Sequence, residues 1–277
     1  MSRMVRVDQL LVAQALVRSR TRAQRLIRHG RVQLIQPGQS RTLTRPGEKL
    51  PEESRFHVAE DPEERYVSRA GLKLEALLAA TGVAPQGLTF LDVGQSTGGF
   101  TDCLLQHGAA RVIGIEVGHD QLDTLLRDDE RVHCLEGVNA RQLPTEHIMA
   151  LAPEGLAGAV MDVSFISQTL ILPELARLLP PGAHLLSLVK PQFELSPEQI
   201  GSGGIVRQAH HYEQVEARLR TCCQQTGLAL HYWGDSPING SDGNREFLMH
   251  ATRVTDRADV QGVCPASPLS DSPGSLS

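Results

Sequence analysis

Two lysines stand out among the residues that could do chemistry in this 277-residue chain, because lysine is otherwise almost absent. Three of its 27 basic side chains are lysines, and they are Lys49, Lys73 and Lys190. Arginine stays charged and suits phosphate contacts, whereas a buried lysine ammonium can change its protonation and so orient or move a proton. A genome rich in arginine codons would produce the same composition. The residues around each lysine must therefore separate the two explanations.

A glycine-rich segment follows a predicted buried strand and could bind a ligand. Residues 88–93 predict the strand, the next seven residues predict a turn, and residues 101–107 predict a helix. Glycine tolerates positive φ and lets backbone approach a ligand closely. The spacing Asp-x-Gly-x-x-x-Gly-Gly is neither a dinucleotide fingerprint nor a P-loop, so it favours a nucleoside over a bare phosphate. The predicted ligand contacts are Asp92, Gly94, Ser96, Thr97, Gly98, Gly99 and Phe100.

Charged side chains come at the ends of further predicted strands. The strand predicted at 111–117 ends in Glu116 and Val117, and an acid at this distance from Asp92 is placed to accept ribose hydroxyls. Helical stretches alternate with the strands, which predicts a doubly wound α/β sheet. Ligands bind at the carboxyl ends of such strands, where Asp162 and Lys190 also fall. The remaining strands are predicted at 132–136, 156–163, 184–190, 228–234 and 246–252.

Charge is distributed unevenly along the chain. The formal net charge is -5, yet residues 1–58 carry 12 Arg and Lys against 4 Asp and Glu, while the remainder carries 15 against 28. A basic module joined to an acidic body predicts an arm that binds a polyanion and a body that acts on it. The length favours two domains, and the Ser- and Pro-rich end of the chain predicts a disordered tail.

The basic N-terminal module predicts a helical hairpin followed by a strand at 31–35. Apolar residues within 7–16 share one helical face, Thr21 is placed to cap a second helix, and Gly30 is placed to end it. Arginines on this module would face solvent, where phosphate oxygens can bond them bidentately and release counterions. The predicted nucleic-acid contacts are Arg6, Arg18, Arg20, Arg22, Arg25, Arg28 and Arg31.

Two parts of the sequence resemble known families. The run RVDQLLVAQALVRSRTRAQRLIRHGRV is similar to the small RNA-binding domain of the ribosomal S-four protein, pseudouridine synthases and tyrosyl-tRNA synthetases. Over residues 4–252 the chain resembles the TlyA family, through the motifs DVGQSTGGFTD, MDVSFIS, LVKPQFE, GGIVR, NREFL and YVSRAGLKL. The resemblance implies an α/β fold, with a Rossmann-like sheet of a methyltransferase that uses S-adenosylmethionine (SAM) and a small N-terminal α/β RNA-binding domain.

The resemblance also implies domain boundaries. Residues 1–60 would form the S-four-type RNA-binding domain and 61–85 the linker and first catalytic-domain helix. Residues 86–253 would form the FtsJ-like methyltransferase domain, and 254–277 the disordered tail. The implied reaction is transfer of a methyl group from SAM to the 2′-hydroxyl of a cytidine ribose in ribosomal RNA, free or within a ribosomal subunit. A cytoplasmic protein is therefore expected.

A Lys-Asp-Lys-Glu arrangement found in ribose methyltransferases is implied as well, and it matches Lys73, Asp162, Lys190 and Glu246. Alignment of hydroxyl, methyl and sulfur supplies much of the rate of such a transfer. Lys190 is expected either to accept the hydroxyl proton or to hold the hydroxyl in line. Lys73, on a helix predicted at 66–80, is expected to pair with Asp162, and Glu246 to orient Lys190 or the ribose. Asn139 and Asp162 are expected to contact SAM.

Other interpretations stay open at this stage. Asp162 could cap a helix predicted at 166–179, and Glu246 could be an ordinary charge at a strand edge. The chain as a whole could be a non-catalytic RNA-binding assembly factor, or a membrane-active haemolysin, a name attached to the TlyA family. Against the latter, no apolar run approaches the roughly 18 residues of a membrane span, and the start of the chain lacks the pattern of a signal peptide. Cysteine and histidine spacings suggest neither a metal site nor a disulfide framework.

Overall fold

The computed structural model describes residues 3–17, 19–59 and 65–254, without the side chain of Ser202. The chain divides into two compact units, Met1–Arg65 and Tyr66–Ser277. Arg18 and, except for Val254, the tail predicted at 254–277 lie outside the described residues.

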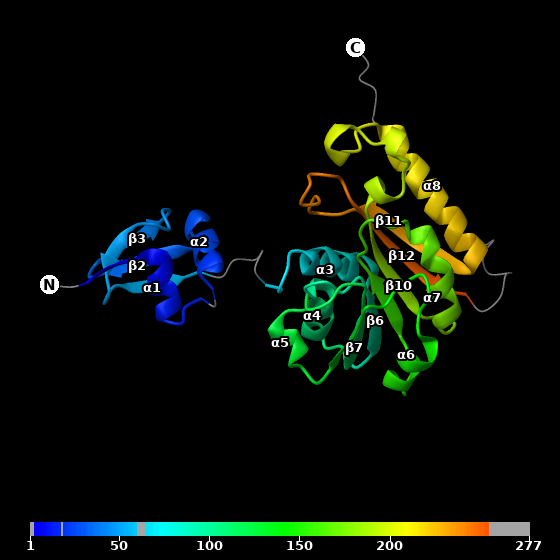
Figure 1. The fold of residues 1–277 in the computed structure, drawn as a ribbon, viewed down its shortest axis with the longest axis horizontal. Helices are drawn as coiled ribbons and strands as arrows, with labels where there is room; N and C mark the ends of the chain where they lie inside the picture. The colour runs from blue at the N-terminus through cyan, green and yellow to red at the C-terminus, as the bar shows by residue number, and fades with distance from the viewer. Residues whose placement is uncertain (1–2, 18, 60–64, 255–277) are drawn as a thin grey trace, which may run out of the picture. The chain divides into compact units, whose positions relative to one another are not determined.

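The first unit is a small α/β module built on two helices and two small sheets (Figure 1). β2 pairs with β3 and β5 on its two sides, and β1 pairs with β4. Its core includes Leu26 and Ile27 of α2, as their spacing predicts. The elements are β1 (Met4–Arg6), α1 (Val7–Ala13), α2 (Arg20–Arg28), β2 (Val32–Gln36), β3 (Gln39–Leu43), β4 (Lys49–Pro51) and β5 (Arg55–Val58).

Two boundaries in this unit differ from the sequence prediction. The first helix ends at Ala13 because the chain turns at Ala15, whose φ is 54°. The cap of α2 is Ser19, not Thr21: the Ser19 side chain accepts a hydrogen bond from the backbone N–H of Arg22. Both residue types can cap, and position relative to the first free N–H groups decides which one does. Gly30, with φ of 68°, follows the helix as predicted.

The second unit is a three-layer α/β structure around a seven-stranded sheet of order β11-β12-β10-β9-β6-β7-β8. The five strands from β10 to β8 run parallel, whereas β12 is antiparallel to both of its neighbours. The strands are β6 (Thr89–Val93), β7 (Arg111–Glu116), β8 (Val132–Glu136), β9 (Gly158–Met161), β10 (His184–Val189), β11 (Leu228–Asp235) and β12 (Phe247–Arg253).

Helices cover both faces of this sheet (Figure 1). Alternate strand residues point to opposite faces, so Leu91 joins one core cluster with α6, α7 and α8, and Phe90 joins the other with α3 and α4. The helices are α3 (Ala70–Thr81), α4 (Gly99–Gln106), α5 (Thr124–Arg127), α6 (Thr145–Leu151), α7 (Leu172–Leu178) and α8 (Ala209–Thr226). Short 3-10 turns add η2 (Gln168–Leu170), η3 (Pro191–Phe193), η4 (Pro197–Gln199) and η5 (Ser202–Gly204).

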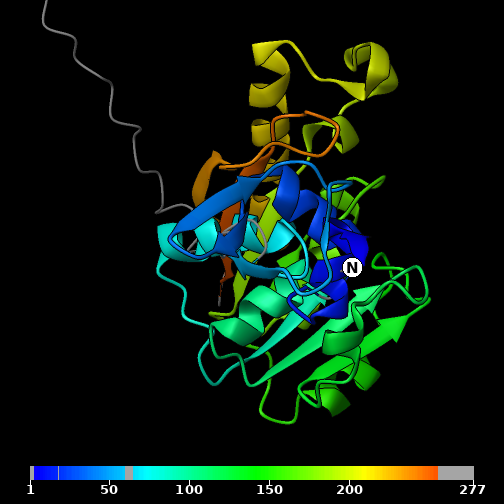
Figure 2. The same cartoon turned by 90° about the vertical axis from the view of Figure 1, so that its left-hand side faces the viewer.

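The strand order places a ligand crevice beside β6. β7 lies on one side of β6 and β9 on the other, so the chain reverses direction across the sheet at this point, and α/β sheets bind ligands there. At the edge of the sheet formed by β11, α8 packs along that strand, as the yellow helix beside the orange strands shows in Figures 1 and 2. The helix predicted at 66–80 starts four residues later, at Ala70, and packs on α4 and β12 within this unit.

Candidate active site

The turn after β6 has the backbone geometry that its glycines predict. Gly94 and Gly98 have φ of 83° and 93°, in the region that favours glycine. A Cβ on Gly94 would lie 2.5 Å from the carbonyl oxygen of Asp162, so a side chain here would push apart β6 and the segment after β9. Ser96 also has positive φ, 47°. The turn therefore brings backbone and the Ser96 hydroxyl to the carboxyl ends of two central strands.

A cavity of about 790 Å³ opens at these strand ends and is large enough for a nucleoside-sized ligand. Glu116 is its main buried charge, 7 % exposed, and its two carboxylate oxygens accept hydrogen bonds from the backbone N–H groups of Ser96 and Gly118, each at 2.8 Å. Each oxygen keeps a second lone pair for a ribose hydroxyl. Six of the predicted cofactor residues line this cavity: Gly94, Ser96, Glu116, Val117, Asn139 and Asp162.

A smaller hollow of about 130 Å³ adjoins the large cavity, because Gly94, Ser96, Asp162 and Ser164 line both. Thr97, Gly99 and Phe100, predicted as ligand contacts, line only this hollow. Lys190 also lines it, so a lysine lies where a second ligand would meet the first. Gly98 and Asp92 line neither space: a Cβ on Gly98 would meet the Leu126 side chain, and Asp92 is fully buried.

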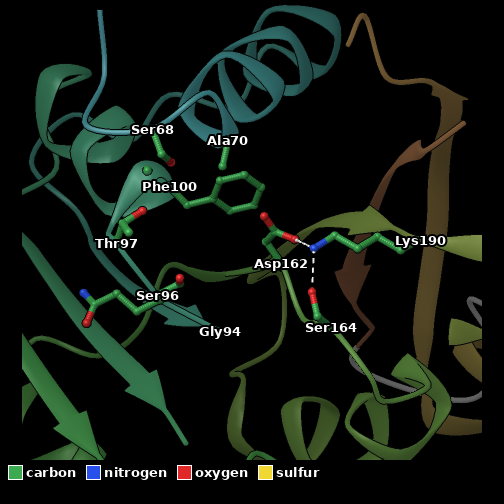
Figure 3. Close-up of a pocket in the computed structure, with 11 residues that line it drawn as sticks. Ser68, Ala70, Gly94, Ser96, Thr97, Phe100, Asp162, Ser164 and Lys190 are labelled. Carbon is green, nitrogen blue, oxygen red and sulfur yellow. Dashed lines mark hydrogen bonds and ion pairs between the residues drawn. The ribbon is translucent and has the colours of Figure 1, made fainter. Parts of the chain in front are cut away.

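Lys190 forms an ion pair with Asp162 in the hollow. Its Nζ lies 2.6 Å from Asp162 Oδ1 and donates a hydrogen bond of 3.0 Å to Ser164 Oγ (Figure 3). The Lys190 and Asp162 side chains are 15 % and 17 % exposed, so the pair is shielded but reachable. Lys190 directly follows β10, and Asp162 directly follows the neighbouring parallel β9. Adjacent strand ends thus bring the two predicted residues together.

Lys73 does not pair with Asp162, and that prediction is wrong. Its Nζ lies 2.5 Å from Glu246 Oε2, and the two side chains are 10 % and 3 % exposed. The reason is the strand order: β12 is inserted next to β10, α3 packs on it, and Glu246 immediately precedes it. Lys73 lines neither cavity.

Glu246 nevertheless lies within electrostatic reach of the other three residues of the Lys-Asp-Lys-Glu match. Burial raises the pKa of Glu246, the charges of Lys73 and Lys190 oppose that rise, and the carboxylate of Asp162 adds to it. The structure therefore brings the four together as two ion pairs. Asp162 caps no helix here, since Ser167 is the residue whose side chain caps η2.

Asp92 is linked to the glycine turn by a chain of hydrogen bonds through Thr101 and Gln95. Its Oδ2 accepts a hydrogen bond of 2.6 Å from Thr101 Oγ1, which in turn accepts one of 2.8 Å from Gln95 Nε2. Burial raises the pKa of Asp92 to about 7, the carboxylates of Asp162 and Glu116 reinforce the rise, and the Thr101 bond opposes it. Gln95 occupies the space above Gly114 of β7, where any Cβ would meet its Oε1. The side chain of Gln95 thus lies against β7, and Gln95 also lines the small hollow.

Sequence reasoning missed several cavity residues. Ser164, Phe165 and Ile166 line the large cavity, as do Gln121 and Arg141, while Ser68 lines the small hollow. The motif MDVSFIS already contained the first three, and its position directly after a predicted strand was the available signal.

In the first unit, the predicted arginines fall into different environments. Arg28 is exposed, whereas Arg22, Arg25 and Arg31 are half-buried. Arg6 and Arg20 are held by the fully buried Asp8, each with a 2.9 Å contact. Although burial alone would raise it, hydrogen bonds from Arg6, Gln24 and Arg20 hold the pKa of Asp8 well below its usual range.

The family model of the FtsJ-like methyltransferases matches residues 66–253, which spans the whole sheet and both cavities. The chain belongs to the FtsJ-like methyltransferase family. Its methyl donor is SAM, and the cavity fits that molecule: Glu116 can hold ribose hydroxyls, exposed Val117 and Leu170 offer an apolar surface for adenine, and Asp162 offers negative charge for a sulfonium.

Relatives of known name cover nearly the entire chain. It is 38% identical, over 93% of both chains, to the 16S/23S rRNA (cytidine-2′-O)-methyltransferase TlyA of Mycobacterium tuberculosis. It is 35% identical to Hemolysin A of Brachyspira hyodysenteriae, over 89% of this chain and 99% of the relative. A solved structure, "Putative hemolysin from Streptococcus thermophilus", is 39% identical, covers 92% of this chain and 90% of its own, and superposes with a TM-score of 0.68. Within the described ranges, none of the helices combines the length and apolar character that crossing a membrane needs.

Proposed function

We propose that this protein transfers a methyl group from SAM to the 2′-hydroxyl of a cytidine ribose in ribosomal RNA. The observation that carries the proposal is the Lys190–Asp162 pair, which lies in a hollow sharing a wall with the nucleoside-sized cavity. The similarity to the Mycobacterium tuberculosis enzyme supports cytidine and ribosomal RNA as the substrate class. The substrate class also supports a cytoplasmic site of action.

The large cavity positions the cofactor. Glu116 would hold the ribose of SAM, and the turn after β6, which lines the small hollow, would hold its methionine end. SAM supplies an electrophilic methyl group on a positively charged sulfur. Asp162, at the wall between the two spaces, stabilises positive charge on the cofactor side and fixes Lys190 on the other.

Lys190 contacts the acceptor hydroxyl in the proposed reaction. Its Nζ is held from two directions, by Asp162 at 2.6 Å and Ser164 at 3.0 Å, so it occupies one position in the hollow. A fixed nitrogen there holds the hydroxyl in line with the methyl group, and alignment of this kind supplies a large part of the rate. Lys73 and Glu246 line neither cavity and stabilise the Lys190–Asp162 pair electrostatically.

The first unit supplies RNA affinity. Its excess of arginine would neutralise phosphates and make binding depend on salt. Arg20 and Arg28 are exposed members of the predicted set, and the buried Asp8 holds Arg6 and Arg20 in place.

The test is methylation of purified 16S and 23S ribosomal RNA and of both intact subunits by the purified protein with labelled SAM. Mass-spectrometric mapping should find new 2′-O-methylcytidine that depends on the protein. Methyl groups on bases alone, or none on any of the four substrates, would contradict the proposal. Leakage of liposomes with no methylation would favour the membrane-active alternative.

A further inference from the structure

Two segments that leave neighbouring strands run side by side at the edge of the hollow. Residues 162–168 follow β9, and residues 190–194 follow β10. Lys190 begins the second segment and bridges to Asp162 and Ser164 of the first. The position of Lys190 therefore depends on how the two segments are held together.

A second bridge closes the far end of the same two segments. Glu194 Oε2 accepts a hydrogen bond of 2.5 Å from Ser167 Oγ, and Glu194 Oε1 accepts one of 2.7 Å from the backbone N–H of Gln168. The Glu194 carbonyl in turn accepts a 2.6 Å bond from Arg218 of α8. Glu194 thus ties residues 162–168 to residues 190–194 and both to a long helix.

The bridged segment 162–168 is conformationally strained. Phe165 has φ of 63°, which is rare for a bulky residue, and its side chain is 90 % exposed. Its ring lies 5.0 Å from that of Phe193, between the two polar bridges. Strain of this kind persists where surrounding contacts overdetermine it, and such positions cluster at functional sites.

We propose that Glu194 is a positioning residue, which fixes Lys190 by bridging residues 190–194 to residues 162–168. Glu194 reaches neither cavity, so it acts through Lys190 and not on substrate. Its carboxyl is 3 % exposed and burial raises its pKa, opposed by the bonds from Ser167 and Gln168 and by the charge of Arg218. Burying a carboxyl is costly, and the two-point bridge supplies a reason for it. This inference rests on the proposed function of Lys190.

The scarcity of lysine makes a direct test available. Amine labelling of the full chain, read by mass spectrometry, reports three side chains, with exposed Lys49 as the internal reference. In Glu194→Ala the labelling of Lys190 should rise by about threefold or more relative to Lys49, because the segment opens more often. Glu194→Gln retains an acceptor and an amide for the bridge and should label like the unchanged protein. Labelling of Lys73, buried against Glu246, should stay constant in both variants.

Methyl transfer to ribosomal RNA supplies the second readout. Glu194→Ala should lower kcat by about tenfold while KM for SAM stays within about twofold, because only the orientation of Lys190 is lost. Glu194→Gln should restore kcat. Exposed Glu198, four residues on, provides the matched control, and Glu198→Ala should leave kcat unchanged. The side chain of Gln168 keeps its bonds to Leu188 and Ser187, so Glu194→Ala retains a folded segment.

The inference is overturned if Glu194→Ala labels and turns over like the unchanged protein, or if Glu194→Gln is as impaired as Glu194→Ala. It is also overturned if KM for SAM rises in step with the loss of kcat, since that pattern indicates general damage to the site. The labelling arm needs no RNA. An unchanged protein that methylates no RNA would therefore remove the proposed function, while Lys190 labelling would still decide whether Glu194 fixes Lys190.

Discussion

The two lysine–carboxylate pairs of the catalytic unit have the same chemistry and nearly the same length, yet they occupy different places. Lys190 and Asp162 lie 2.6 Å apart in the wall of a hollow, whereas Lys73 and Glu246 lie 2.5 Å apart between α3 and the start of β12, away from both cavities. Residue type alone therefore does not identify the group that meets substrate. The neighbouring cavity does: Lys190 and Asp162 line the small hollow, whereas Lys73 and Glu246 line neither cavity.

Removing Lys190 should give the largest effect on function. Lys190→Ala should lower the rate of methyl transfer by roughly 10²-fold or more, because the group that aligns the acceptor hydroxyl is lost. The affinity for SAM should change little because Lys190 does not line the large cavity, and the melting temperature should change little because Lys190 and Asp162 are partly exposed. Single-turnover assays and calorimetry measure the two quantities, and Lys49→Ala is the control for loss of a lysine. A variant that binds SAM more weakly but keeps transfer at saturating SAM would place Lys190 on the cofactor side.

Removing Lys73 should act mainly on stability. Lys73→Met leaves Glu246 buried without its partner, and breaking a buried pair in this way costs about 3–5 kcal/mol. Adding Glu246→Leu should recover most of that loss, because no charge is then left without a partner. Urea unfolding of the single and double variants provides the measurement. Equal stability of Lys73→Met and the unchanged protein would mean that the two pairs do not differ as described.

Glu116 differs from the two lysine-paired carboxylates because backbone N–H groups, and not a lysine, hold its carboxylate. Glu116→Ala should weaken SAM binding by about tenfold or more, since hydrogen bonds to a charged group contribute roughly 1.5–3 kcal/mol each. The SAM affinity of Glu116→Gln should lie between that of Glu116→Ala and that of the unchanged protein, because the glutamine amide keeps one acceptor oxygen. Titration of SAM by calorimetry tests this, and an unchanged affinity in Glu116→Ala would exclude Glu116 as the ribose contact.

Asp92 is a fully buried carboxyl without a lysine, and it should show a modest dependence on pH. Its pKa is about 7 in the folded protein against 3.8 as the ordinary value, so the folded state binds the extra proton between these limits. The stabilising contribution is complete below pH 3.8 and is lost as pH rises through about 7. Over that window Asp92 should lower stability by on the order of 1 kcal/mol per pH unit. Asp92→Asn should remove this slope in melting curves from about pH 4 to about pH 7, and an unchanged slope would contradict the assignment.

Much of the fold was predictable from local sequence. All seven strands of the large sheet fall where apolar runs predict them, with the ends of β9 shorter than expected. The glycine turn and the meeting of Asp162 with Lys190 followed from one rule, that ligands gather at the carboxyl ends of parallel strands. The partner of Lys73 did not follow, because it depends on β12 entering the sheet beside β10, and residue periodicity carries no strand order. Glu194 was missed for the same reason, since its bridge joins segments that only the sheet brings together.

In the proposed function, Lys190 serves the reacting hydroxyl, and Lys73 and Glu246 stabilise the Lys190–Asp162 pair electrostatically. The most direct measurement is the single-turnover rate of methyl transfer, at saturating SAM and on the same ribosomal RNA, in Lys190→Met and in the charge-balanced double variant Lys73→Met with Glu246→Leu. Lys190→Met should lose transfer almost completely, whereas the double variant should fold and retain transfer within about tenfold of the unchanged protein. Transfer by Lys190→Met at the unchanged rate, or a larger loss in the double variant than in Lys190→Met, would contradict the account.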